Sequence, residues 1–257
     1  MNSFGRLFQF SLLGTSHGPG VGVLIDGCPA GLALGQDDLA VDLARRRAGR
    51  PGTTARAEPD RPNFMAGLYQ GMTTGEPILI WFDNTDTDPA AYAGLIHTPR
   101  PGHADLTART KAGGHNDPRG GGAFSGRLTV GLVAAGAVAR KLLGEVSIRA
   151  ELIEAGGSTD VDATVAAAAA DGDSVGGLVE CRVTGLPAGL GEPWCDSLEG
   201  LLAHLVFSIG GVRGIAFGAG FDSARMRGSE CNDAILDVGV AGVGEVAVGG
   251  VDVDRER

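Results

Sequence analysis

The segment 128–143 (LTVGLVAAGAVARKLL) constrains the fold more than any other part of this sequence. Its composition predicts a helix, but its apolar residues run almost all the way round the helix axis, so this helix has to be buried. Aromatic residues make up only 5% of the chain, while hydrophobic residues make up 43%. The core around the helix must therefore be built mainly from Val, Leu, Ile and Ala.

Strand patterns surround this helix on both sides in the sequence. Five segments are predicted to be strands: 6–13, 20–26, 77–82, 147–156 and 177–185. A helix is predicted over 37–47, since Asp37 and Asp38 lie at its start and arginines at its end, the order that the helix dipole favours. A second helix is predicted to begin at Asp196, where Asp-Ser-Leu-Glu resembles a capping box, and the alanine run 166–170 is expected in a surface helix. This mixture predicts an α+β fold with helices packed against sheets.

The charge pattern favours a small anionic ligand over a polymer. The net charge is −10, which argues against a nucleic-acid binder, because neutralising phosphates requires a basic face. Arginines nevertheless concentrate in the segments 45–61 and 100–127. Guanidinium groups suit small anions that carry phosphate or carboxylate groups. A solvated charged face is the alternative explanation of the same pattern.

The cysteines and the hydropathy pattern bear on location. Four widely spaced cysteines form no CxxC pair, which fits reduced thiols in the cytoplasm better than disulfides or a zinc site, and no metal is expected. No apolar run is long enough to cross a membrane, and the N-terminal segment is interpreted as a strand and not as a signal peptide.

Glycine-rich segments carry the candidate chemistry. His17 lies in GTSHGPG and His103 in RPGHAD, where neither imidazole has an evident core to fill. The segment 98–127 has little periodicity and is predicted to be a long functional loop. Within it, RGGG at 119–122 exposes backbone N–H groups that suit an oxyanion, and Ser125 and Arg127 add donors. His204, in the middle of a predicted helix, is interpreted as a packed residue.

Several segments together resemble the chorismate synthase family. They follow the family's order and cover most of residues 4–236: FGRLFQFSLLGTSHGPGVGVLIDGCPAGL (4–32), DLARRRAGR (42–50), GLYQGMTTGEPI (67–78), NTD (84–86), RPGHAD (100–105), GGHNDPRGGGAFSGR (113–127), GDSVGG (172–177), GLPAGLGEP (185–193) and MRGSE (226–230). The family fold is a sandwich of antiparallel sheets around internal helices, usually assembled as a homotetramer. The resemblance therefore implies this α+β architecture, which agrees with the buried helix at 128–143.

The resemblance implies a lyase of the shikimate pathway, which supplies aromatic amino acid biosynthesis. Members eliminate phosphate from 5-enolpyruvylshikimate 3-phosphate to give chorismate, and they require reduced FMN without consuming it overall. On this basis His17 is expected to be the acid that supports phosphate departure, and His103 to protonate the reduced flavin or hold it in its reactive state. Contacts to the anionic substrate are assigned to Arg46, Arg50, Arg100 and Arg127, with Ser16 and Ser125 as hydrogen-bond donors.

Cofactor contacts also follow from the resemblance alone. Ala123, Phe124 and Ser125 align with an FMN-contacting segment, and Gly210 and Gly211 align with a further loop on the flavin side. The NADPH-linked flavin reduction of some members maps onto Arg46 and Arg50. The commonest form of the family has Arg and Ser where Ala123 and Phe124 stand here.

The resemblance stops after Leu236, and two domain segments are predicted: residues 1–236 as an incomplete chorismate synthase-like domain, and 237–257 as an atypical Val/Gly-rich tail. Residues 237–254 contain only Asp, Val, Gly, Ala and Glu, whose codons all begin with G, so a shift of reading frame is the hypothesis for this tail. The family's later flavin and GRHDP segments are not found there, so weak FMN binding is expected. A genuine Val/Gly-rich edge strand is the alternative.

Two other function classes are alternatives to a chorismate synthase-like enzyme. One is a catalytically dead flavin- or anion-binding module, or a truncated pseudoenzyme that pairs with intact chains. The other is an unrelated flavoprotein that shares a phosphate loop, which the ordered set of motifs disfavours.

Overall fold

The computed structural model describes residues 2–49, 53–54, 56–232 and 242–249. The chain divides into two compact units, the first made of residues 1–48 and 56–142 and the second of residues 49–55 and 143–257. The division falls inside the stretch 1–236 that the sequence predicts as one domain.

The first unit is built on an antiparallel five-stranded sheet. Its strands, in spatial order, are β1 (Ser3–Gly5), β2 (Gln9–Gly14), β3 (Gly20–Asp26), β7 (Ile78–Asp83) and β4 (Asn63–Ala66). A separate two-stranded ribbon contains β5 (Leu68–Tyr69) and β6 (Met72–Thr73). The strand predicted over 6–13 corresponds to β2, which begins three residues later, and residues 6–8 connect β1 to β2. Strand β3 has the predicted bounds.

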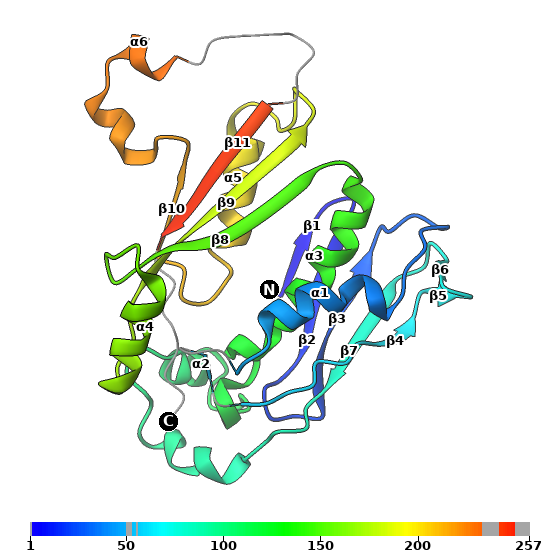
Figure 1. Cartoon of the computed structure of the whole chain (residues 1–257). Coiled ribbons are helices and arrows are strands. Elements are labelled where there is room, and N and C mark those ends of the chain that lie inside the picture. The colour runs from blue at the N-terminus through cyan, green and yellow to red at the C-terminus, as the bar shows by residue number, and fades with distance from the viewer. Residues whose placement is uncertain (1, 50–52, 55, 233–241, 250–257) are drawn as a thin grey trace. The chain divides into compact units, whose positions relative to one another are not determined.

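Two long helices pack on one face of this sheet (Figure 1). The helices of this unit are α1 (Gln36–Arg46), α2 (Asp105–Lys111) and α3 (Thr129–Leu143), with 3₁₀ helices at Pro89–Ile96, Arg119–Phe124 and Gly126–Leu128. Alternate residues of β3 and β7 point to the helices and are fully buried, as the period of two in a strand requires. They meet Leu39 and Leu43 of α1 and the small residues of α3 in one hydrophobic core.

The burial predicted for the segment 128–143 is confirmed for its first part only, because Leu142 and Leu143 at its C-terminal end are exposed. Six residues of α3 are buried, and Arg140 and Lys141 lie in its last turn, where cations are favourable. Gly131 lets this helix approach the sheet closely. A Cβ atom added there would lie 2.8 Å from Leu12 Cδ2 and 3.1 Å from the carbonyl oxygen of Gly22.

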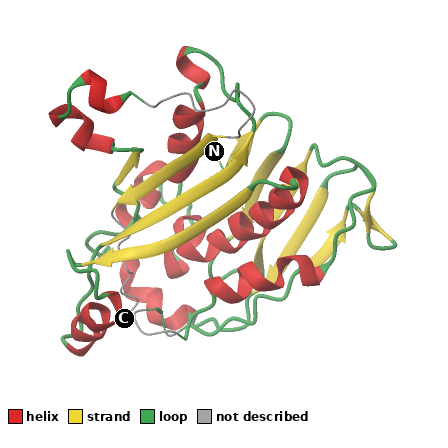
Figure 2. Cartoon of the chain, turned by 45° about the horizontal axis from the view of Figure 1, so that its top comes forward, coloured by secondary structure: helices red, strands yellow, loops and turns green. Residues whose placement is uncertain are grey.

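The second unit holds an antiparallel four-stranded sheet, which Figure 2 shows with its long strands side by side. Its strands, in spatial order, are β10 (Gly214–Phe217), β11 (Gly242–Gly249), β9 (Gly177–Leu186) and β8 (Ser147–Ala155). Its helices are α4 (Val161–Ala170), α5 (Leu198–Val206) and α6 (Gly228–Cys231), with 3₁₀ helices at Trp194–Asp196 and Gly220–Arg225. No residue of α4 is buried, in agreement with the predicted surface helix. The α+β class with antiparallel sheets is confirmed.

Strand β11 lies within the tail 237–257. Its backbone pairs with β9 on one side and β10 on the other, so this part of the tail is an inner strand of the sheet and not an edge strand. The rest of the tail lies outside the described residues. The reading-frame hypothesis for the tail stays a prediction.

Two local predictions differ from the structure. The segment 98–127 is not all loop, because α2 occupies its centre, with Asp105 in the first turn and Arg109 and Lys111 in the last. Helix α5 begins one residue later than the capping pattern suggested. Ser197, not Asp196, is the N-cap, since its side-chain oxygen accepts a 3.1 Å hydrogen bond from the backbone N–H of Gly200.

Three negative findings apply to the described part of the chain. No helix there is long and apolar enough to cross a membrane. No group of three or more His, Cys, Asp and Glu side chains there could hold a metal ion. The four cysteines are free thiols, and burial raises the pKa of Cys28 and of Cys181.

The close contact of α3 with the sheet gives the first prediction. Gly131→Val should lower the free energy of unfolding by about 1–3 kcal/mol, because the added methyl groups press on the backbone of β3. Gly136→Val in the same helix is the matched control. Nothing lies within 4 Å of a Cβ atom at that position, so the change should stay within about 0.5 kcal/mol. Urea unfolding of both variants checks this, and equal effects would contradict the packing of α3.

Candidate functional site

The turn between β2 and β3 carries Ser16 and His17. Ser16 is fully buried, and the His17 residue is 7% exposed. The backbone N–H of Ser16 donates to the carbonyl oxygen of Gly122 at 3.1 Å. Asn84, the residue after β7, also holds the turn, because its side-chain amide donates to the carbonyl oxygen of Thr15 at 3.0 Å. The turn is therefore fixed both to the end of β7 and to the glycine-rich loop.

The glycine loop Gly120–Gly122 lies against both candidate histidines. All three residues have left-handed backbone angles, with φ of 56°, 81° and 59°, which glycine adopts without strain. A Cβ atom on Gly120 would lie 2.2 Å from His17 Nδ1, and one on Gly121 would lie 3.5 Å from His103 Cε1. Only glycine fits at position 120, and the two imidazoles lie beside successive residues of one loop.

Tyr92 and Arg100 extend this cluster. The rings of His17 and Tyr92 meet edge to face with their centroids 4.7 Å apart. The guanidinium carbon of Arg100 lies 5.6 Å from the centroid of the Tyr92 ring, and its Nη2 lies 3.3 Å from His103 Nδ1. Tyr92 was not predicted from the sequence, because a lone aromatic residue in an Ala-rich segment gives no signal.

Asp105 holds Arg100 in place from the first turn of α2. Its carboxylate accepts from Arg100 Nε at 2.9 Å and from Nη2 at 3.0 Å, and it also accepts from the backbone N–H of Arg100. Hydrogen bonding to Arg100 lowers the pKa of Asp105, in spite of its burial. His103 Nδ1 lies 3.7 Å from the same carboxylate. Asp105 thus orients Arg100 directly, and Arg100, which can only donate, holds Nδ1 of His103 in turn.

A second carboxylate, Asp60, joins two of the predicted anion-binding arginines. It is 2% exposed and accepts from Arg46 Nη1 at 2.7 Å and from Arg127 Nη1. Arg127 is almost enclosed, since Nε donates to Asn84 Oδ1 at 3.0 Å and its side chain is 3% exposed. Burial, reinforced by the charge of Arg127 and opposed by that of Asp60, lowers the pKa of Arg46, which still stays protonated. Arg46 Nε is buried without a hydrogen-bond partner, unlike the other buried side-chain polar atoms of the described residues.

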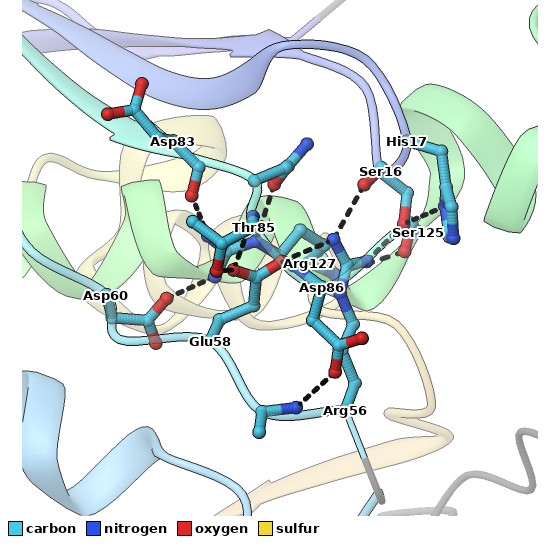
Figure 3. Close-up of polar contacts among 12 residues, drawn as sticks. Ser16, His17, Arg56, Glu58, Asp60, Asp83, Thr85, Asp86, Ser125 and Arg127 are labelled. Atoms are coloured by element: carbon cyan, nitrogen blue, oxygen red, sulfur yellow. Dashed lines mark hydrogen bonds and ion pairs between the residues drawn. The ribbon is translucent and has the colours of Figure 1, made fainter. Parts of the chain in front are cut away.

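A third arginine, Arg56, reaches the Ser16 turn from the segment that precedes β4 (Figure 3). Its Nη1 and Nη2 atoms donate to Ser16 Oγ and to the carbonyl oxygen of Ser16, both at 2.8 Å. Glu58 anchors the guanidinium on its other side at 2.7 Å. The sequence placed Arg56 in an arginine-rich segment but gave it no role, because several arginines crowd there and only the fold selects among them.

The remaining predicted residues occupy varied positions. Ser125 is buried and accepts from the backbone N–H of Arg127 at 3.3 Å, whereas Ala123 is exposed and Phe124 is 50% exposed. Gly210 and Gly211 belong to the second unit, in the turn between α5 and β10. Arg50 lies outside the described residues.

A pocket of about 130 Å³ adjoins the glycine loop. It is lined by Leu95, Asp105, Ala108, Arg109, Gly114, Asn116, Pro118 and Gly121. The charged side chain of Arg109 and the amide of Asn116 share its wall with the Asp105 carboxylate that holds Arg100. The first unit thus brings two imidazoles, four arginines and a polar hollow to one glycine-rich surface, an arrangement able to bind a multiply charged anion and to place acid groups against it.

Comparisons with known proteins relate the chain to a family. The family model described as chorismate synthase matches residues 8–253. A chorismate synthase of Chitinophaga pinensis is 56% identical over 238 residues, covering 92% of this chain and 72% of that protein. One from Pyrococcus abyssi is 44% identical over 256 residues, covering 89% of this chain and 72% of that protein.

A solved structure supports the same fold. A crystal structure described as that of chorismate synthase superposes with a TM-score of 0.75 and 23% identity, covering 96% of this chain and 86% of the other. Because the family model spans nearly the whole chain and the relatives match most of it, the chain belongs to the chorismate synthase family.

Proposed function

We propose that this chain eliminates phosphate from 5-enolpyruvylshikimate 3-phosphate to form chorismate, the step of the shikimate pathway that its relatives' name denotes. The observation that carries the proposal is the placement of His17 and His103 against successive glycines of one loop. The match to named enzymes over most of the chain favours this reading over a dead flavin-binding module.

Arg46 is the strongest candidate for a direct contact with the anionic substrate. Its Nε donor is buried and has no acceptor, which costs free energy unless a ligand oxygen or water supplies one. Asp60 holds the positive charge of Arg127 next to that of Arg46. A direct contact between Arg127 and the substrate must use guanidinium N–H groups that make no hydrogen bond within the protein. Arg100 and Ser125 complete the proposed set, and Arg50 remains proposed from the family resemblance alone. The resemblance also assigned Ser16 to the substrate, but its single hydroxyl hydrogen is fully buried beside His17 Nδ1, so Ser16 is not proposed as a direct donor to the substrate.

The donors present fit a flavin phosphate and ring, so FMN is the proposed cofactor. Arg109 in the pocket wall suits an anionic group, and the half-exposed Phe124 offers an apolar surface beside Ala123 and Ser125. Reduced FMN supplies electron density to the substrate when bound and is not consumed overall. Gly210 and Gly211, and NADPH binding through Arg46 and Arg50, are carried forward as proposals from the resemblance.

The chain's own contribution is to bind, orient and donate protons. His17 is proposed as the acid at the departing phosphate, and His103 as the group that holds or donates a proton at the flavin. Asp105 holds Arg100, whose Nη2 lies against Nδ1 of His103, which suits an imidazole that must present its other nitrogen in a fixed direction. His17 is buried except for 7% of its surface, so most of it is shielded from bulk water.

Location and assembly are proposed on separate grounds. The free cysteines of the described residues support a reducing cytoplasm. A homotetramer is proposed from the family resemblance, and the half-exposed apolar side chains of Ile148 and Leu152 on β8 suit a subunit contact. Light scattering of the purified chain measures its mass directly, and a monomer at all concentrations would exclude the tetramer.

The histidine roles give a prediction about rate. His17→Ala and His103→Ala should each lower kcat by about 100- to 10,000-fold, because each removes a positioned acid–base group. The assay uses chemically reduced FMN with the phosphorylated substrate and follows chorismate. His204→Ala is the control. His204 is exposed on α5, so its interpretation as a packed residue was wrong, and no role is proposed for it. Equal rates in all three variants and the parent would refute the assignment, as would tight FMN binding without turnover.

The Asp60 pair gives a prediction about stability. Asp60→Asn should lower the free energy of unfolding by about 3–5 kcal/mol, because it leaves two guanidinium groups buried around a neutral amide. Asp42→Asn breaks a matched Arg–Asp pair with Arg140, whose side chain is 42% exposed, and should cost at most about 1 kcal/mol. Urea denaturation compares the two, and a loss at Asp60 no larger than at Asp42 would contradict a buried hub.

Asp105 gives a prediction about pH. Its pKa is lower in the folded protein than in the unfolded chain, so its contribution to stability is present above the ordinary Asp pKa of about 4 and is lost as the pH falls through the lowered value. Unfolding measured from about pH 7 to pH 2 should therefore show that Asp105→Asn is less stable than the parent near neutrality and that the gap narrows in acid.

Asp222→Asn is the control for this pH series. Asp222 pairs with Arg225 at 2.7 Å, but both side chains are more than three-quarters exposed, so little stability depends on the pair. A gap at Asp105 that stayed constant down to the lowest pH would contradict the ion-pair assignment.

A further inference from the structure

Arg56 has no part in the proposed reaction, yet it is tightly built into the site. Its side chain is 13% exposed, and two of its nitrogens donate to Ser16, one to the hydroxyl and one to the carbonyl oxygen. These bonds come from a guanidinium, whose planar donors fix direction as well as distance. Arg56 thus controls both the backbone and the side chain of the residue that precedes His17.

Glu58 fixes Arg56 from behind. Its side chain is 5% exposed and accepts from Arg56 Nε at 3.1 Å and Nη2 at 2.7 Å. It also accepts from the backbone N–H and the hydroxyl of Thr85, at 2.9 Å and 2.8 Å. Burial raises the pKa of Glu58, but these hydrogen bonds outweigh it and leave the pKa below its usual value. The carboxylate therefore stays charged and holds the guanidinium against Ser16.

The hydroxyl of Ser16 has two side-chain partners in the part of the chain that is described. One is Arg56 Nη1, which can only donate, and the other is His17 Nδ1 at 3.2 Å. Because Ser16 is fully buried, its hydroxyl hydrogen cannot turn to water. Since Arg56 uses an oxygen lone pair and offers no acceptor, the hydroxyl hydrogen is directed to His17 Nδ1.

We propose that Arg56 is a positioning residue that acts through Ser16 to make Nδ1 of His17 a hydrogen-bond acceptor, so that the neutral ring carries its proton on Nε2. The role of His17 in the reaction rests on the proposed function, but the tautomer does not. Nε2 is the ring nitrogen remote from Ser16, and there it donates a hydrogen bond to an oxygen of the phosphorylated ligand. No covalent bond changes in this ground state.

The tautomer is measured by ¹⁵N NMR of the full chain with labelled histidine. Five histidines give five pairs of ring ¹⁵N signals, one from Nδ1 and one from Nε2, and His17→Gln identifies the pair that matters. Spectra are recorded near pH 9, above the ordinary imidazole pKa of about 6.5. The parent should hold the Nε2-protonated form of His17 in about tenfold excess, the size of effect that one buried hydrogen bond supports.

Four variants separate positioning from structure. Ser16→Ala removes the hydroxyl and leaves the Arg56–Glu58 pair intact, and it should return the tautomer ratio to that of the urea-unfolded chain. Arg56→Met should do the same, while Arg56→Lys, which keeps a donor, should retain part of the excess. Arg140→Met breaks a surface pair of the same unit and should leave the ratio unchanged. A parent ring protonated on Nδ1, or a ratio that Ser16→Ala leaves unchanged, would overturn the proposal.

Kinetics distinguish this inference from the proposed function. If the parent forms chorismate, Arg56→Met should lower kcat about tenfold or more with a smaller change in KM, and Arg56→Lys should recover part of the loss. If the parent forms no chorismate, the proposed function fails while the tautomer measurement still decides the role of Arg56. An unfolded Arg56→Met, detected by circular dichroism, leaves Ser16→Ala as the deciding variant.

Discussion

The close contact between Gly120 and the ring of His17 is the constraint on which the rest of the site depends. The left-handed path of Gly120–Gly122 brings the backbone within a distance of the imidazole that any side chain would prevent. The same path carries the chain on to His103, and it places the carbonyl oxygen of Gly122 where Ser16 N–H can reach it. Three consecutive glycines therefore join the turn after β2, the loop before α2 and the start of α3 into one surface.

Around this surface, arginines are held by buried carboxylates and are not left to solvent. Asp60 pairs with Arg46 and Arg127, Glu58 pairs with Arg56, and Asp105 pairs with Arg100. Burying these ion pairs costs desolvation free energy that offsets much of their attraction. Their main effect is therefore to fix the positions of the guanidinium groups and not to stabilise the fold. An acidic chain can in this way present concentrated positive charge at one place. The unsatisfied Nε of Arg46 shows where that arrangement still lacks an acceptor.

The sequence predicted the long strands and helices better than it predicted the contacts between residues far apart in the chain. Segment 20–26 and the helix at 128–143 came out almost as predicted, because period and composition both pointed the same way. Helix α2 was missed, since six of its seven residues are polar or small, and Leu106 alone makes no apolar stripe. His17 and His103 stood out by their glycine neighbours. Asp60, Arg56 and Tyr92 did not, because their roles arise from contacts between residues far apart in the sequence, which no local pattern encodes.

We expect the imidazole of His17 and the guanidinium of Arg46 to contact the phosphorylated ligand beside Gly120–Gly122, and the imidazole of His103 to contact the flavin. A crystal structure of the chain soaked with 5-enolpyruvylshikimate 3-phosphate and oxidised FMN tests it most directly. The account predicts density for the phosphorylated ligand in contact with His17 and with Arg46 Nε, and a flavin next to His103. Ligand density on another surface of the chain, with these side chains untouched, would contradict it.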